Sequence, residues 1–135
     1  MASLESVKEF FKKDRFATEV CGIEILEAEP GRSLCEMKIQ EKHANAGGVV
    51  QGGAIFTLGD FAYAIASNSG GTMSVTLDNQ ISFITPATGS FLRAEAVERS
   101  ETNRLCFYDV NIFDESKTLV AKMTVTGYKK GTINF

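Results

Sequence analysis

The stretch GGVVQGGAIFTLGDFAYAIASNSGG, residues 47–71, is the most apolar part of the chain and decides the fold that we expect. Its composition predicts a helix from about Gly53 to Ser67, which the glycines of SNSGG bring to an end. Apolar residues stand on every side of this helix, so it must be buried on most sides. It is too short and too interrupted to span a bilayer. The rest of the chain therefore has to wrap around it.

The segments on either side of this helix predict the sheet that covers it. Two strands are expected around the turn Pro30-Gly31, within residues 20–40. Four β-rich segments follow the helix, and their short connecting turns favour antiparallel pairing. They are TMSVTLDNQISFITP (72–86), SFLRAEAVERS (90–100), LCFYDVNIFD (105–114) and TLVAKMTVTGYKK (118–130). This order of elements indicates the α+β class, with an antiparallel β-sheet wrapped around one long central helix.

The N-terminal segment and the length of the chain complete this expected architecture. Leu4 to Asp14 predict a short amphipathic helix that Ser3 caps. With 135 residues and no linker or repeat, residues 1–135 are expected to form a single domain, in which 1–18 are an N-terminal helix and lead-in. One flank of the central helix stays open, and we expect a second copy of the chain to cover it.

Composition narrows the class of function. The net charge of −3 and the pI of about 5.2 argue against nucleic acid as a partner, although a small phosphorylated ligand remains compatible. No signal peptide and no membrane-spanning run is predicted, so we expect a cytoplasmic protein with no membrane partner. The three cysteines have no metal-binding spacing and His43 is the only histidine, so we expect reduced thiols and no metal site.

Asp60 is the only charged residue between Ala44 and Leu77. Burying an isolated carboxylate is costly, and acids are rarely buried unless they are paired. One interpretation places Asp60 on a polar edge of the helix or in a contact with backbone. The other interpretation is a functional acid in a dry pocket, where acids with perturbed pKa values gather.

A glycine turn, QGGA at residues 51–54, opens the same helix. A helix N-terminus presents unpaired backbone N–H groups, and glycines let a ligand approach them closely. Such donors suit the negative charge that develops on a carbonyl oxygen under attack. A tight loop with flexible glycines is the alternative interpretation. The turn lacks Gly-Lys-Ser/Thr and is therefore not a nucleotide-binding P-loop.

The spacing of Gly52 and Asp60 has a consequence for assembly. They are eight residues apart, which is about 12 Å along a helix. One ester or thioester group cannot contact both ends of that span. If both residues serve one reaction, Asp60 must meet the glycine turn of another helix, and the chain predicts only one such helix. We therefore expect an isologous dimer with antiparallel central helices.

Two segments, HANAGGVVQGGAIFTLGDFAYAIASNS (43–69) and ISFITPATGSFLRAEA (81–96), resemble the PaaI-type thioesterases of the hotdog-fold superfamily. The resemblance covers roughly Cys21 to Tyr128. It implies the hotdog fold, a homodimer as the minimal active unit and a homotetramer built from it. The implied reaction is hydrolysis of an acyl-CoA to a free acid and CoA, with no cofactor beyond the CoA of the substrate. The residues that fill the motif are Asn45, Gly48, Gly52, Gly53 and Asp60.

The resemblance also implies roles for individual residues. Asp60 would act as the general base or nucleophile, and the backbone N–H of Gly52 from the other subunit would polarise the thioester carbonyl. Asn45 would hold the loop or the water, and Gly53 would contact the substrate. The end of the next strand would line the substrate groove, although packing within the strand and turn explains these residues equally well. They are Phe83, Thr85 and Pro86.

Gln51 departs from the family pattern, which usually has a His before Gly-Gly. Gln accepts no proton at pH 7 but can hydrogen-bond a carbonyl or water. This leaves Asp60 as the candidate base and keeps open a second function, a non-catalytic module that binds or senses acyl-CoA. A hydratase is disfavoured because that chemistry pairs a His with an acid, and His43 is expected to be a loop residue.

Several other residues are weaker candidates. Three basic residues are candidates for contacts with the CoA phosphates, namely Arg93, Lys129 and Lys130. Three aromatic residues either border the acyl chain or belong to the core, and core packing is the expected role. They are Phe56, Phe61 and Tyr63. Cys106 has no predicted partner that would make it a nucleophile.

Overall fold

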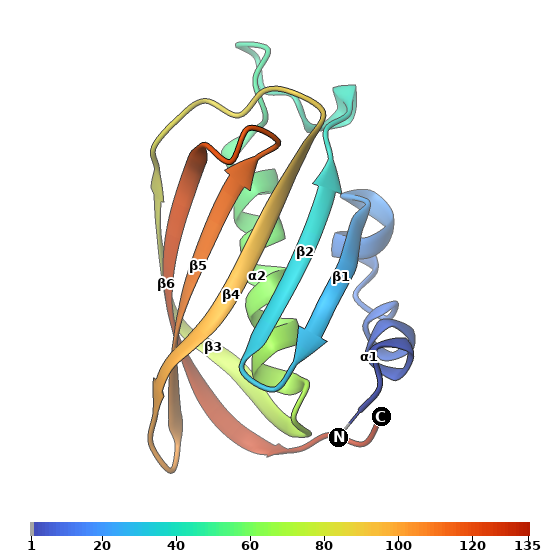
Figure 1. Cartoon of the computed structure of the whole chain (residues 1–135), viewed down its shortest axis with the longest axis vertical. Coiled ribbons are helices and arrows are strands. Elements are labelled where there is room, and N and C mark those ends of the chain that lie inside the picture. Colours follow the sequence, from blue (N-terminus) through green and yellow to red (C-terminus); the bar gives the residue numbers. More distant parts are fainter. Residues whose placement is uncertain (1) are drawn as a thin grey trace.

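The computed structural model describes residues 2–135 and contains a six-stranded antiparallel sheet curled around helix α2 (Figure 1). The strand order is β1-β2-β4-β5-β6-β3, so β1 and β3 are the two edges. The strands are β1 (Ile23–Glu29), β2 (Arg32–Lys38), β3 (Thr72–Phe83), β4 (Phe91–Glu101), β5 (Leu105–Asp114) and β6 (Leu119–Thr132). The helical elements are α1 (Leu4–Phe11), η1 (Phe16–Val20), η2 (Glu41–His43) and α2 (Gly52–Asn68). The predicted α+β class is confirmed.

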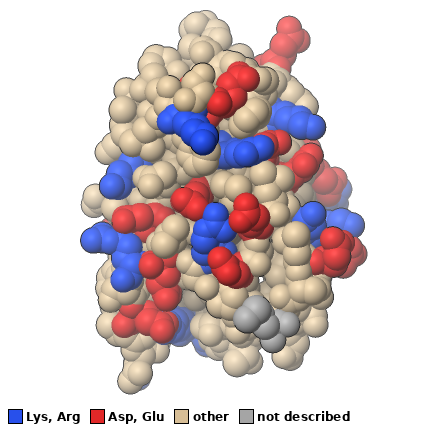
Figure 2. All heavy atoms as spheres, in the orientation of Figure 1, with Lys and Arg blue, Asp and Glu red and all other residues tan. Residues whose placement is uncertain are grey.

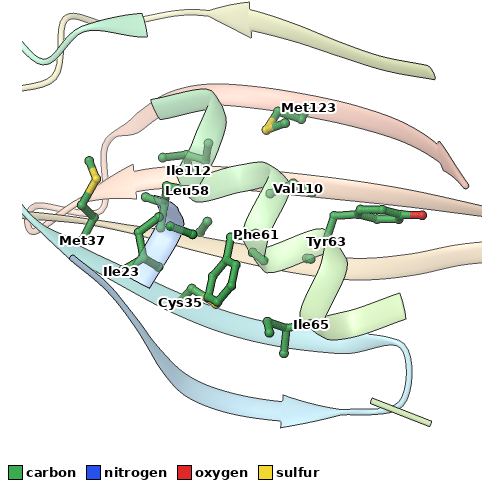
Figure 3. Close-up of a cluster of buried hydrophobic side chains, with 14 of the residues drawn as sticks. Ile23, Cys35, Met37, Leu58, Phe61, Tyr63, Ile65, Val110, Ile112 and Met123 are labelled. Atoms are coloured by element: carbon green, nitrogen blue, oxygen red, sulfur yellow. The ribbon is translucent and has the colours of Figure 1, made fainter. Parts of the chain in front are cut away.

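Helix α2 forms the centre of the core, as its apolar sequence predicts (Figure 3). It extends one residue beyond the predicted helix at each end. Leu58, Phe61 and Ile65 are at most 1% exposed. They face the inward side of the sheet. In every strand except β3, alternate residues are buried on this side, because successive side chains of a strand point to opposite faces. These include Cys35, Met37, Val110, Ile112 and Met123. None of the helices within residues 2–135 is long and apolar enough to cross a membrane.

Glycines let the sheet approach α2 closely, and we expect Gly127→Ala to destabilise the protein. A Cβ at Gly127 would collide with the hydroxyl of Tyr63 and the sulfur of Cys106, which are both buried. Overpacking of this kind costs about 1–3 kcal/mol. The measurement is urea denaturation, with Gly131→Ala on the same strand as the control, because a Cβ there meets nothing within 4 Å. Equal free energies of unfolding for the two variants would contradict this account.

The N-terminal helix is shorter than predicted. Ser3 caps α1 by accepting a hydrogen bond from the Ser6 N–H, but α1 ends at Phe11 rather than at Asp14. The Asp14 side chain instead accepts a hydrogen bond from the Ala17 N–H at 3.1 Å and opens the π-helical turn η1, which the sequence did not predict. Asp has this preference because its short side chain competes for nearby backbone N–H groups.

The outward face of the sheet is covered by cross-strand ion pairs. Arg93 of β4 binds Glu36 of β2 at 2.8 Å, and Arg99 of β4 lies 3.2 Å from Asp109 of β5. Figure 2 shows basic and acidic side chains interleaved on the face in view. This face presents no large field of one sign.

Strand β3 presents a different surface, an edge with exposed apolar side chains. Leu77 is 60% exposed, Phe83 is 55% exposed, and Ile84, directly after the strand, is 53% exposed. A long apolar edge strand offers a row of unpaired N–H and C=O groups to another chain. Strand β3 is therefore a sheet edge that carries exposed apolar side chains.

Candidate active site

The glycine turn at the start of α2 presents unpaired hydrogen-bond donors. Gln51 is the N-cap residue, with an extended backbone, but its side chain makes no capping hydrogen bond. Within residues 2–135, neither the Gly52 nor the Gly53 N–H has an acceptor. The Gln51 side chain lies beside Gly53, where its amide oxygen would be 2.5 Å from an added Cβ. The turn therefore keeps the donors that the oxyanion interpretation requires.

Asn45 holds the loop that leads into this turn. Its side-chain oxygen accepts hydrogen bonds from the Gly47 N–H at 2.8 Å and the Val49 N–H at 3.2 Å. Its own backbone N–H donates to the carbonyl of Val49 at 2.7 Å. Gly48 takes a φ of +85°, a conformation that costs glycine little. Asn45 thus determines the shape of the loop through hydrogen bonds to backbone.

His43 holds the same loop in place through hydrogen bonds of its ring. The ring is 4% exposed, and its Nδ1 accepts a hydrogen bond from the Gln40 N–H at 3.0 Å. The Nε2 lies 2.9 Å from the carbonyl oxygen of Cys21 and therefore carries the proton that it donates. Both ring nitrogens are engaged, which agrees with the expected role of His43 as a loop residue.

Two cavities flank the glycine turn. The first, of about 300 Å³, brings together most of the predicted site, since its lining includes Asn45, Gly52, Phe83, Thr85 and Pro86. The ring of Phe83 lies over Gly52, with its Cζ 3.1 Å from where a Cβ would be. The second cavity, of about 480 Å³, is lined by the other three residues of the turn, Gln51, Gly53 and Ala54. Thr85 and Pro86 lie just beyond the end of β3.

Asp60 lies further along α2 and lines neither cavity. Its carboxylate accepts a hydrogen bond from the side-chain Nδ2 of Asn79 on β3, with 3.4 Å between the two atoms. Burial raises the pKa of Asp60, the Asn79 hydrogen bond lowers it, and the negative charge of Asp14 raises it. Burial is the largest of these causes, so Asp60 holds its proton more tightly than an exposed aspartate. A single chain does not bring Asp60 to its own glycine turn.

Two of the three basic candidates for contacts with the CoA phosphates are already paired with acidic side chains. Arg93 is engaged by Glu36 on the outward face of the sheet. Lys129 pairs with Glu101 and donates to the carbonyl oxygen of Thr102 at 2.8 Å. Among the aromatic candidates, Phe61 and Tyr63 are each 1% exposed and belong to the core, as expected.

Sequence reasoning missed Asn79 as the partner of Asp60. The two residues are 19 positions apart, and a register shift of β3 against β6 between Thr76 and Asp78 breaks the simple alternation of the strand. No pattern in the sequence shows which β3 side chain turns toward α2. Only the tertiary contact identifies it.

The chain belongs to the thioesterase superfamily, whose family model matches residues 47–121. Acyl-coenzyme A thioesterase PaaI of Escherichia coli is 31% identical over 101 residues, covering 74% of this chain and 72% of that one. Its structure matches with a TM-score of 0.85 at 25% identity, covering 98% and 100% of the two chains. These findings confirm the predicted hotdog fold, the resemblance to PaaI-type proteins and the class of enzyme, a thioester hydrolase.

Two further similarities extend this picture. A protein of Archaeoglobus fulgidus, whose name gives esterase as its expected activity, is 33% identical over 127 residues, covering 93% of this chain and 82% of that one. A Streptococcus mutans protein solved with bound acetyl CoA matches with a TM-score of 0.79 at 26% identity, covering 83% of this chain and 91% of that one.

Proposed function

We propose that this protein is an acyl-CoA thioesterase, which hydrolyses the thioester to a free acid and CoA. The observation that carries the proposal is the glycine turn, where two unpaired N–H groups at a helix N-terminus flank cavities able to admit a thioester. The relatives support CoA as the carrier, because PaaI is named an acyl-coenzyme A thioesterase and the Streptococcus mutans protein binds acetyl CoA.

In the proposed reaction, Asp60 acts as a general base. A water gives one proton to the Asp60 carboxylate while its oxygen forms a bond to the thioester carbon. The carbonyl oxygen becomes an oxyanion, which the N–H of the partner subunit's Gly52 stabilises. The C–S bond then breaks, and the proton on Asp60 passes to the CoA thiolate. The raised pKa of Asp60 suits this role, because a general base works best with a pKa near the working pH. Direct attack by the carboxylate, followed by hydrolysis of the anhydride, is the nucleophilic alternative.

The active unit in this proposal is a homodimer formed through the β3 edges. In one chain Asp60 contacts Asn79, and Gly52 lies against Phe83. The eight helical residues from Asp60 to Gly52 span about 12 Å, and the four strand residues from Asn79 to Phe83 span about 13 Å. Helix α2 and strand β3 therefore run antiparallel, and the two contacts are separated by nearly the same distance along the helix and along the strand.

This matching determines a register for the pairing of two β3 strands. In an antiparallel pair, the numbers of opposing residues have a constant sum. Asp60 comes closest to the partner subunit's Gly52 when Asn79 lies opposite the partner subunit's Phe83. The two-fold axis then passes through Ile81, and both sites are completed at once. We further propose that such dimers form a homotetramer, that residues 1–135 act as one domain and that the protein, with three buried free thiols, works in the cytoplasm.

Gln51 favours one alternative, a non-catalytic module that binds acyl-CoA. The experiment that separates the two functions follows thiol release from short, medium and aromatic acyl-CoAs and measures CoA binding in parallel. Turnover of at least one substrate supports the enzyme. Tight binding to the same compounds without thiol release from any of them would favour the module.

A further inference from the structure

The side chain of Asn79, which lies beside Asp60, is incompletely hydrogen-bonded. Its Oδ1 is the one buried side-chain nitrogen or oxygen atom within residues 2–135 that has no hydrogen-bond partner. Its Nδ2, on the same carboxamide, donates to Asp60 Oδ1 at 3.4 Å. Buried polar atoms are nearly always satisfied, and an exception in a folded protein calls for a specific explanation. The unsatisfied acceptor therefore marks a place next to the acid where a hydrogen-bond donor would bind.

The chemistry of the pair identifies this donor. An ionised carboxylate only accepts hydrogen bonds, so the amide group of Asn79 must turn its Nδ2 toward Asp60 and its Oδ1 away from it. A water molecule has two protons to donate. Placed between the two side chains, it gives one hydrogen bond to the Asp60 carboxylate and the other to Asn79 Oδ1. A lone pair of its oxygen is then free to attack a carbonyl carbon.

We propose that Asn79 is a further catalytic residue, which binds the attacking water together with Asp60 and fixes the orientation of the Asp60 carboxylate. This inference rests on the proposed thioesterase function. In the step itself, one O–H bond of the water breaks toward Asp60, and the second proton stays on the water oxygen, hydrogen-bonded to Asn79. The new C–O bond forms, the C–S bond breaks, and Asp60 returns its proton to the thiolate.

The groups around Asp60 allow a second, independent test of the role of Asn79, the pH dependence of kcat. From β3 the facing group is Asn79, whose N–H favours the ionised carboxylate, while Asp14, after α1, opposes ionisation. Tyr63 on α2 also interacts with Asp60, and burial raises the pKa of Tyr63, which keeps it neutral near pH 7. Removing the Asn79 N–H therefore raises the pKa of Asp60 further. The acid limb of the kcat profile should move to higher pH, since the base works only when ionised.

The test compares Asn79→Leu and Asn79→Asp with Asn111→Leu, which makes the same substitution at an exposed position of β5, away from the β3 edge. We expect Asn79→Leu to lower kcat by about 10- to 100-fold with KM nearly unchanged, because a misplaced water costs rate rather than binding. Both Asn79 variants should shift the acid limb upward, and Asn79→Asp should shift it further because it places a like charge beside Asp60. Asn111→Leu should leave the profile unchanged.

Oligomeric state and unfolding temperature are measured on the same samples. If Asn79→Leu fails to fold or to dimerise, the role of Asn79 is tested by Asn79→Asp instead, because Asp keeps the size and shape of the side chain. An active wild type with an unshifted acid limb in the Asn79 variants overturns the role of Asn79 but leaves the thioesterase proposal standing. A wild type that hydrolyses no acyl-CoA overturns both. A loss of rate in Asn79→Leu that disappears at higher protein concentration assigns Asn79 to the dimer contact instead.

Discussion

Replacing Asp60 with Asn is expected to abolish thioester hydrolysis while the protein stays folded and binds CoA. Asn keeps the shape of the side chain but cannot accept the proton of the attacking water, and removing a general base typically costs about 10²- to 10⁴-fold in rate. The measurement is kcat by thiol release together with the dissociation constant for CoA. Equal turnover in the wild type and in Asp60→Asn would remove Asp60 from the mechanism.

The same substitution should stabilise the protein, which provides the control for folding. Burial raises the pKa of Asp60 above its value in the unfolded chain, so the stability linked to this group is complete below the unfolded pKa and is lost as the pH rises through the folded pKa. At neutral pH the ionised Asp60 is therefore a cost. Asp60→Asn should unfold a few degrees higher than the wild type at pH 7, and the difference should shrink in acid. A lower unfolding temperature at pH 7 would contradict the burial of an ionised Asp60.

Two inactive variants are expected to restore activity when they are mixed. The first is Asp60→Asn. The second is Gly52→Pro, which removes one backbone donor at the first residue of α2, where proline is tolerated and the N–H has no helical acceptor. Gln51 already has the extended backbone that a residue before proline requires. An added Cβ at Gly52 would lie 3.1 Å from the Cζ of Phe83, so the Phe83 ring has to shift by a few tenths of an ångström.

The expected gain follows from the two-fold symmetry of the proposed dimer. In a heterodimer, the Asp60→Asn chain supplies an intact Gly52 and the Gly52→Pro chain supplies an intact Asp60, so one of the two sites is complete. Random reassociation of equal amounts makes half of the dimers mixed, which predicts about a quarter of wild-type activity. The measurement is thiol release after joint unfolding and refolding. Activity that stays at the level of the separate variants, in samples that contain heterodimer, would place the whole site in one chain.

The apolar run of residues 47–71 predicted the architecture because only one arrangement buries it, a helix enclosed by the rest of the chain. A helix with no polar stripe has to be enclosed, and the β-rich segments separated by short turns provide an antiparallel sheet for that purpose. The glycine turn was likewise visible in the sequence, because a helix N-terminus without a capping side chain exposes its donors wherever it lies. The bounds of α2 accordingly differ from the prediction by a single residue at each end.

Other features were not predictable in this way. The early end of α1 depends on competition between the Asp14 side chain and the helical backbone, which is decided by small energy differences. The exposed position of β3 depends on the strand order, because β3 pairs with β6, the last strand of the chain. Sequence alternation alone does not show which strand lies at an edge.

The sequence by itself determined the central helix, the surrounding sheet, the glycine turn and the lone acid, because these follow from local periodicity and from the cost of exposing apolar surface. The tertiary structure decided that Asn79 meets Asp60 and that Phe83 covers Gly52. It also decided that β3, with its exposed apolar side chains, lies at an edge of the sheet. These are contacts between residues far apart in the chain, and they depend on strand order and register, which local sequence patterns do not encode.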